Sequence, residues 1–266
     1  MTPHDARRKW GSGDVNSAVS RGVVVAVSAV AALCLTAGCS GSGGGGGKDD
    51  GAGDGRGKPS KSASRAPGAS STVAKLEKAA LASGDVKKYK VEKAPAKAAG
   101  EARVTPAECR PLAEMLDAAA PQESKAHVSR ALSSTDVANT TTTEVVLLAY
   151  DQGDAEKTMD TLRAATKSKK CATFGDGGHR YFGTRPQPAP VTGDEAVSYK
   201  LANRSGEFLE RHRVSVVRSG STVIAFRAVN IFDPQAAGAE ENGNPADPVV
   251  AEEIVDAQLA KLARTK

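Results

Sequence analysis

Residues 207–231 read EFLERHRVSVVRSGSTVIAFRAVNI, two runs rich in alternating apolar residues on either side of the segment RSGS. Alternation with a period of two is typical of a β-strand that buries one face, and a Ser-Gly pair between two such runs predicts a hairpin. With Ser219-Gly220 as the turn, apolar residues face one another across the two strands. The expected pairs are Val216 with Val223, Val214 with Ala225, and Phe208 with Ile231.

A second hairpin extends this face. The preceding strand ends at the segment NRSG, and a turn at Arg204-Ser205 places Leu201 opposite Phe208. Because a slip of one residue would send every side chain to the other face, the agreement of the two hairpins favours one continuous apolar face. We therefore expect an α+β fold in a single domain, an antiparallel β-sheet with helices packed mainly on one face.

The domain is expected to cover residues 72–266, where helical and strand patterns alternate without an internal repeat. Helices are expected at 73–83, 105–120, 154–169 and 249–264, and strands at 86–92, 126–132, 142–150, 179–184, 195–202, 207–218 and 221–231. In the second helix, Thr105, Pro106 and Glu108 match an N-cap, a first-turn proline and a capping box. The strand at 142–150 is apolar enough on both faces to be central.

Two of the four cysteines belong to this domain. Cys34 lies in an apolar run near the N-terminus, and Cys39 follows that run. Cys109 and Cys171 remain, and two cysteines in an oxidising compartment most simply form one disulfide, here closing a loop of about 60 residues. A metal site formed with His179 is the alternative, although no CxxC or HxxxH spacing accompanies it.

The N-terminal segment matches an export signal. Residues 1–22 carry four Lys or Arg, and Val23 to Leu35 form an uncharged, mostly apolar run of 13 residues. As a helix this run is about 20 Å long, short of the roughly 30 Å core of a bilayer, so a signal peptide over 1–38 is expected rather than a membrane span. The segment LTAGC resembles the lipobox of bacterial lipoproteins. The resemblance implies transfer of a diacylglyceryl group, with fatty acids such as palmitate, to the thiol of Cys39 and cleavage before that residue.

Two adjacent arginines, Arg7 and Arg8, leave the export route open between the Sec and twin-arginine pathways. The surrounding ARRKW lacks most of the usual twin-arginine context, so Sec export is expected. Two acyl chains hold a protein on a membrane for practical purposes permanently. We therefore expect a lipid-anchored protein on the outer face of the cytoplasmic membrane.

Residues 39–71 are expected to form a flexible tether. Ten of the 19 residues from 40 to 58 are Gly, and the next dozen are mostly Ser, Lys, Ala and Pro, a composition that does not support a packed core. The whole chain has a formal charge of +5, but the leader and the tether carry +2 each and the domain about +1. A nearly neutral domain argues against nucleic acid as a partner.

The order of short motifs in the domain resembles a known family. The motif GDVKKYKV, a cysteine-bearing helix, a helix ending at KKC, the motif GDEA before paired strands, and a closing AQLAKL helix follow one another. This order resembles the extracellular sensor domain of actinobacterial receptor serine/threonine kinases, which also occurs on lipoproteins. The resemblance implies a ligand-sensing module with a central cleft and without established catalysis. That family typically has two disulfides, whereas this chain can form one.

Three titratable residues fall on the otherwise apolar face. In the expected register His212 lies opposite Arg227, and Glu210 lies diagonal to Arg227. Because a buried charge needs a partner, one interpretation is a Glu210–Arg227 ion pair shared with His212 at the end of the sheet. The other is a ligand cleft in which His212 and Arg227 hold an anionic or polar head group, with His212 responding to pH. Arg211 and Arg213, on the opposite face, are expected to face solvent.

Two other polar segments carry weaker signals. GDGGH at 175–179 is expected to be a turn, and the acidic segment 233–247 a solvated loop rather than a calcium site, because its spacing matches no calcium-binding loop. The sequence contains no nucleophile-elbow, zinc-protease or phosphate-loop motif.

These features predict a monomeric, non-catalytic lipoprotein without a cofactor or metal, which binds a lipid, glycan or protein of the cell envelope. Three alternatives stay open. A lipid carrier would have an enclosed apolar cavity, a hydrolase of envelope substrates would use Glu210 and His212, and a structural or interaction lipoprotein would bind only another envelope protein.

Overall fold

The computed structural model describes residues 67–94, 103–116, 121, 123–237 and 247–265. The expected signal peptide, Cys39 and the tether as far as residue 66 lie outside these residues. Residues 67–71, expected to be the end of the tether, instead begin a helix.

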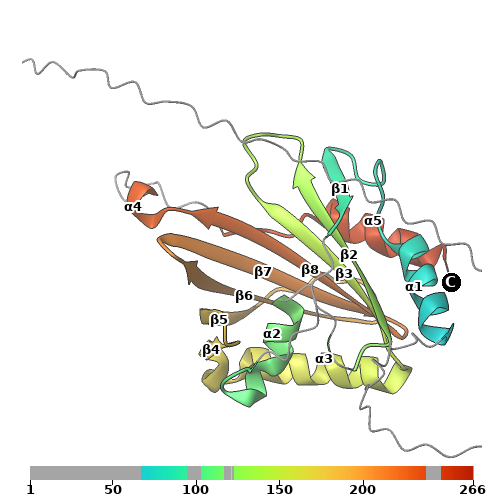
Figure 1. Ribbon diagram of the computed structural model, residues 1–266, viewed down its shortest axis with the longest axis horizontal. Coiled ribbons are helices and arrows are strands. Elements are labelled where there is room, and N and C mark those ends of the chain that lie inside the picture. The colour runs from blue at the N-terminus through green and yellow to red at the C-terminus, as the bar shows by residue number, and fades with distance from the viewer. Residues whose placement is uncertain (1–66, 95–102, 117–120, 122, 238–246, 266) are drawn as a thin grey trace, which may run out of the picture. The chain divides into compact units, whose positions relative to one another are not determined.

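Eight antiparallel strands form one sheet in the order β1-β2-β3-β8-β7-β6-β5-β4 (Figure 1). The strands are β1 (Tyr89–Lys93), β2 (Ala126–Ser134), β3 (Thr142–Ala149), β4 (Thr173–Gly175), β5 (Arg180–Gln187), β6 (Glu195–Ser205), β7 (Phe208–Ser219) and β8 (Thr222–Phe232). The α+β class is confirmed. The strand expected to be central, β3, lies inside the sheet between β2 and β8.

Helices cover both faces of the sheet (Figure 1). The helices are α1 (Pro67–Ala79), α2 (Arg110–Leu116), α3 (Gln152–Lys167), α4 (Pro234–Ala237) and α5 (Glu252–Ala263), with short 3-10 turns at Ala107–Cys109 and Lys169–Ala172. The core on one face contains residues of α2 and α3, and the core on the other contains residues of α1 and α5. We call these the α2/α3 face and the α1/α5 face.

The central strands are buried on both faces. Val146 and Leu148 of β3 pack in the α2/α3 core, whereas Val145 and Leu147 pack in the α1/α5 core. Strands buried on both faces have continuous apolar runs, such as VVLL at 145–148. The expectation that helices pack mainly on one face is therefore wrong, because these runs supply apolar surface to two layers of helices.

The two hairpins turn later in the sequence than expected. Ser205 pairs with Phe208 and Ser219 pairs with Thr222, so the turns are Gly206-Glu207 and Gly220-Ser221. Gly206 and Gly220 have φ values of 61° and 63°, the left-handed region that the first turn residue of a tight hairpin requires and that glycine adopts without strain.

The expected cross-strand pairs are correspondingly wrong. Val216 lies opposite Ala225 rather than Val223, and Leu201 lies opposite His212 rather than Phe208. The pairing of β7 with β8 is shifted by two residues from the expected register, and the pairing of β6 with β7 by four. An even displacement keeps each side chain on its expected face, so the faces are confirmed although the pairs are not.

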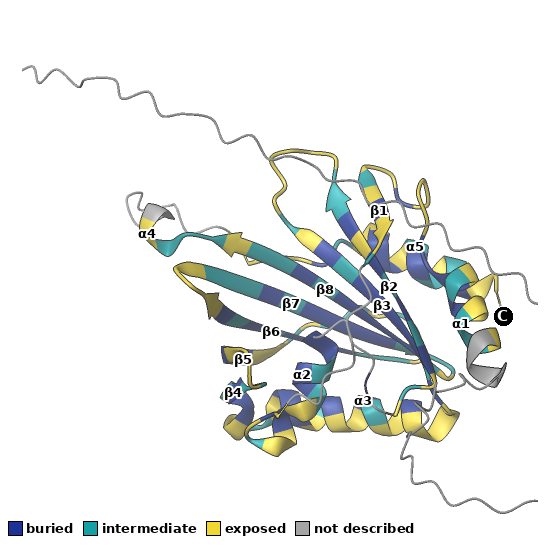
Figure 2. Cartoon of the chain, viewed as in Figure 1, coloured by how far each residue is buried: buried dark blue, intermediate teal, exposed yellow. Residues whose placement is uncertain are grey.

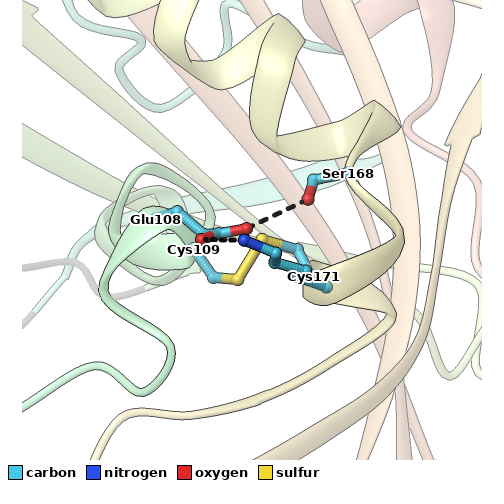
Figure 3. The surroundings of a disulfide bond; sticks show 5 residues. Glu108, Cys109, Ser168 and Cys171 are labelled. Carbon is cyan, nitrogen blue, oxygen red and sulfur yellow. Dashed lines mark hydrogen bonds and ion pairs between the residues drawn. A yellow bond between two sulfur atoms is a disulfide. The ribbon is translucent and has the colours of Figure 1, made fainter.

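The disulfide between Cys109 and Cys171 is confirmed. Figure 3 shows it joining the turn before α2 to the turn after α3, and both cysteines are fully buried. Glu108 accepts a hydrogen bond from Ser168 Oγ at 3.3 Å (Figure 3) and lies 3.3 Å from Lys170 Nζ. The expected capping box is therefore wrong, because Glu108 binds the segment across the disulfide.

The C-terminal end of α1 is fixed by two buried polar side chains. Gln258 of α5 donates a hydrogen bond to the carbonyl of Ala79 at 2.7 Å and accepts one from the N–H of Leu81 at 3.2 Å. Arg130 of β2 donates to the carbonyl of Leu81 at 2.8 Å and to Glu77 at 2.6 Å. These bonds satisfy groups that a helix end leaves unpaired, and they tie α1 to the sheet and to α5.

Replacing Gln258 with leucine should destabilise the domain by about 2–4 kcal/mol, because two buried backbone groups lose their partners. Urea unfolding of the full chain measures this change in the free energy of unfolding. The control is Glu253→Gln, an exposed site on the same helix. A Gln258→Leu variant as stable as the control would contradict the assigned role.

Candidate ligand-binding site

The candidate residues lie on the α2/α3 face, where β7 and β8 extend past these helices toward α4. Figure 2 shows both strands changing from buried to half-buried or exposed in that direction. Tyr199 of β6 marks the boundary, because its buried hydroxyl donates a hydrogen bond to the carbonyl of Leu112 in α2 at 3.2 Å. Beyond Tyr199, polar and charged side chains join the apolar ones on this face.

Arg227 pairs with a residue that the hairpin reasoning did not include. Glu144 of β3 lies directly opposite Arg227 in the sheet, and the two side chains form a largely buried ion pair. Glu210 instead lies opposite Ile231. The expected Glu210–Arg227 ion pair is therefore wrong, because the shift of two residues separates them and a neighbouring strand supplies the carboxylate.

His212 lies diagonal to Arg227 rather than opposite it, since its cross-strand partner is Val229. Its Nε2 is 2.5 Å from Oδ1 of the buried Asn203, and Asn203 Nδ2 donates a hydrogen bond to Glu210 Oε2 at 3.2 Å. Since the amide oxygen of Asn203 can only accept, Nε2 of His212 must carry the proton. A neutral His212 then presents Nδ1 as a hydrogen-bond acceptor.

Burial keeps His212 neutral. Desolvation, reinforced by the positive charge of Arg227, lowers the pKa of His212 to about 3. The expected response of His212 to pH near neutrality is therefore absent from the folded protein. A base this weak also suits hydrogen bonding better than general-base catalysis, for which a pKa near the working pH is best.

Two buried nitrogen atoms in this cluster have no hydrogen-bond partner in the part of the chain that the structure describes. They are Nδ1 of His212 and Nε of Arg227. The first is an acceptor and the second is a donor. An unpaired buried polar group costs about 1–3 kcal/mol, a cost that a molecule supplying both partners would recover.

A neighbouring turn completes the cluster. The ring of Tyr181 stacks edge-on against His212, with centroids 6.2 Å apart, and its hydroxyl donates a hydrogen bond to Asp176 Oδ2 at 3.1 Å. Asp176 also accepts hydrogen bonds from the backbone N–H groups of Gly178 and His179. Burial opposes ionisation of Asp176, yet these donors hold its pKa below the usual value. GDGGH is therefore a turn, as expected.

The sequence reasoning missed four members of the cluster: Glu144, Asp176, Tyr181 and Asn203. Asn203 was assigned to a turn, and the correct register would have placed it beside Glu210. The other three lie on β3, on β5 and in the turn before β5, whose positions in the sheet do not follow from the two hairpins.

The two arginines expected to face solvent are partly buried. The guanidinium of Arg211 lies 4.7 Å from the centre of the Phe232 ring and 3.5 Å from Asp247. Arg213 donates a hydrogen bond to Gln187 at 2.5 Å. The segment after β5 and the approach to α5 cover this part of the α1/α5 face, which the sequence alone did not indicate.

The metal alternative is excluded for the cysteines, because Cys109 and Cys171 are bonded to each other and offer no thiolate. Within the described ranges, no group of three His, Cys, Asp or Glu is arranged to hold a metal ion. Most of the acidic loop, residues 238–246, lies outside those ranges. No helix among the described residues is long and apolar enough to cross a membrane.

No family model and no curated protein matches the chain. Among solved structures, the extracellular domain of PknH from Mycobacterium tuberculosis matches with a TM-score of 0.43 and 8% identity, over 73% of this chain and 95% of that chain. A putative uncharacterised protein, an Rv0999 ortholog from Mycobacterium smegmatis, matches with a TM-score of 0.38 and 12% identity, over 71% and 94%. Function is therefore inferred below from this chain's own side chains.

The buried His212 should make the domain less stable in mild acid. In the unfolded chain His212 takes up a proton near pH 6.5, whereas the folded protein resists protonation down to about pH 3. The unfolded state thus binds more protons, and the free energy of unfolding should fall by about 2 kcal/mol between pH 7 and pH 5. Denaturant titrations at each pH measure this slope.

The matched variant is His212→Gln, which cannot take up a proton. Its free energy of unfolding should change much less over the same interval, because carboxylates titrate mostly below that range. An equal slope in the two proteins would show that His212 does not have the assigned pKa.

Proposed function

We propose that this chain is a lipid-anchored, extracytoplasmic protein whose domain binds a ligand of the cell envelope without catalysing a reaction. The leader and the cysteine at position 39 support the anchor. The buried Cys109–Cys171 disulfide supports an oxidising compartment, where such bonds persist.

The unpaired nitrogen atoms of His212 and Arg227 carry the ligand-binding part of the proposal. His212 Nδ1 requires a donor and Arg227 Nε–H requires an acceptor. A hydroxyl group can serve as either, so a hydroxylated ligand such as a sugar or a lipid head group fits the site. The cost of leaving both atoms unpaired is recovered when the ligand binds.

Apolar side chains lie farther along the same face. Phe208 is 43% exposed and Ile231 is 59% exposed, and the strand alternation places both on the α2/α3 face with Glu210 and His212. They offer a surface for the apolar part of a ligand beside the polar cluster. A polar cluster next to exposed apolar residues is the usual composition of a small-molecule site.

Intact mass spectrometry of the full chain tests the anchor. The chain recovered from the membrane fraction of a bacterium that processes lipoproteins should begin at Cys39 and carry diacylglycerol, since two acyl chains give stable anchoring. A Cys39→Ser variant should lose the lipid. A chain recovered from the cytosol with its leader intact and its thiols reduced would refute the proposal.

Native mass spectrometry of the same preparation tests the ligand site. A hydroxylated molecule should co-purify with the protein, and Arg227→Gln should lower its affinity about tenfold, the value of one hydrogen bond to a charged group. The control is Arg204→Gln, an exposed arginine that the strand alternation places on the opposite face.

Two outcomes would contradict non-catalytic binding. One is equal occupancy in wild type, Arg227→Gln and Arg204→Gln. The other is turnover of an envelope substrate that disappears in Glu210→Gln, which would favour a hydrolase instead.

A further inference from the structure

A pocket lies on the opposite side of the sheet from the His212 cluster. It has a volume of about 470 Å³ and lies between the segment Pro188–Thr192, the middle of β7 and the start of α5. Arg213 and Ser215 of β7 line it on the α1/α5 face, and Val255 of α5 contributes to both the pocket and the core of that face.

The cation in this pocket lacks a carboxylate partner. Within the described residues, Arg213 donates hydrogen bonds only to neutral acceptors, Gln187 Oε1 at 2.5 Å and the carbonyl of Pro188 at 3.5 Å. Burial lowers the pKa of its guanidinium, and Asp247 only partly offsets the effect. A charge withdrawn from water is costly when its counter-ion compensates it only in part, so Arg213 is suited to receive an anion.

The neighbouring strands increase the need for an anion. Lys200 of β6 lies directly opposite Arg213, and Arg185 of β5 lies opposite Lys200. Like charges directly opposite each other in a sheet repel. Asp247 forms ion pairs with Lys200 at 2.6 Å and with Arg211 at 3.5 Å. Arg213 lines the pocket, so an external anion in the pocket would neutralise the charge of Arg213.

Acidic residues on α5 line the other side of the pocket. Glu252 and Asp256 are four residues apart and therefore share one side of the helix. Both are exposed, and within the described part of the chain neither carboxylate forms an ion pair or hydrogen bond. Positive and negative groups thus line one pocket without pairing with each other.

The rim of the pocket is apolar. Pro188 and Pro190 line it together with Val191 and Val249, and both valines are well exposed to solvent. Exposed apolar side chains around charged groups indicate a ligand that has an apolar part beside its charges.

We propose that this pocket binds a small zwitterion with an apolar part, its anionic group on Arg213 and its ammonium group on Glu252 and Asp256. Such a molecule supplies the missing partner to each charged side chain that lines the pocket. Both an apolar amino acid and a phospholipid with a zwitterionic head group have this chemistry. This site is separate from the His212 cluster, so its test is independent of the function proposed above.

Isothermal titration calorimetry of the full chain tests the pocket with four probes. Leucine and glycerophosphoethanolamine are zwitterions, whereas 4-methylpentanoate keeps only the anion and 3-methylbutylamine only the ammonium group. At least one zwitterion should bind, and each singly charged analogue of leucine should bind about tenfold more weakly than the bound zwitterion. Binding of leucine alone identifies an amino-acid site, and binding of glycerophosphoethanolamine alone identifies a head-group site.

Variants assign the contacts. Arg213→Gln and the double variant Glu252→Gln/Asp256→Asn should each weaken binding of the zwitterion about tenfold, and Arg213→Lys should restore part of it. The double variant changes only exposed residues, so it tests the site even if Arg213→Gln disturbs the fold. Arg204→Gln and Glu253→Gln are the matched controls and should bind as wild type.

Three results would overturn the proposal. They are the absence of binding by both zwitterions, binding of a singly charged analogue as tight as that of the zwitterion, and unchanged binding by the Glu252→Gln/Asp256→Asn variant.

Discussion

The burial of β3, β7 and β8 on both faces is the constraint on which the rest of the structure depends. Side chains of a strand alternate between its faces, so one apolar run such as VVLL supplies two cores at once. Each core requires its own layer of helices, α2 with α3 on one side and α1 with α5 on the other. Both candidate sites lie beside these cores, one on each face, where charged side chains replace apolar ones.

Much of this fold could be predicted from the sequence because strand periodicity assigns each residue to a face. That assignment correctly placed His212 and Arg227 on the same face of the sheet. The register could not be predicted, because a shift by two or four residues leaves every face unchanged and only the turns differ. The choice between Ser219-Gly220 and Gly220-Ser221 depends on which residue must adopt a positive φ, and the structure places Gly220 there.

Long-range partners account for the remaining errors. Glu144 reaches Arg227 from β3, more than 80 positions earlier in the chain, and Glu108 contacts Ser168 across the disulfide rather than capping its own helix. Arg213 is half-buried by segments that are distant in sequence. Local patterns specify helices and strands, but ion pairs form wherever the assembled sheet brings charges together.

The disulfide also has a mechanical consequence. It joins two residues 62 positions apart and so closes a covalent ring that contains α2, β2, β3 and α3. Tension applied to the two ends of the chain passes through the sulfur–sulfur bond and bypasses that ring. About 200 Å of contour length is therefore protected from stretching, and force can extend only the segments on either side of it.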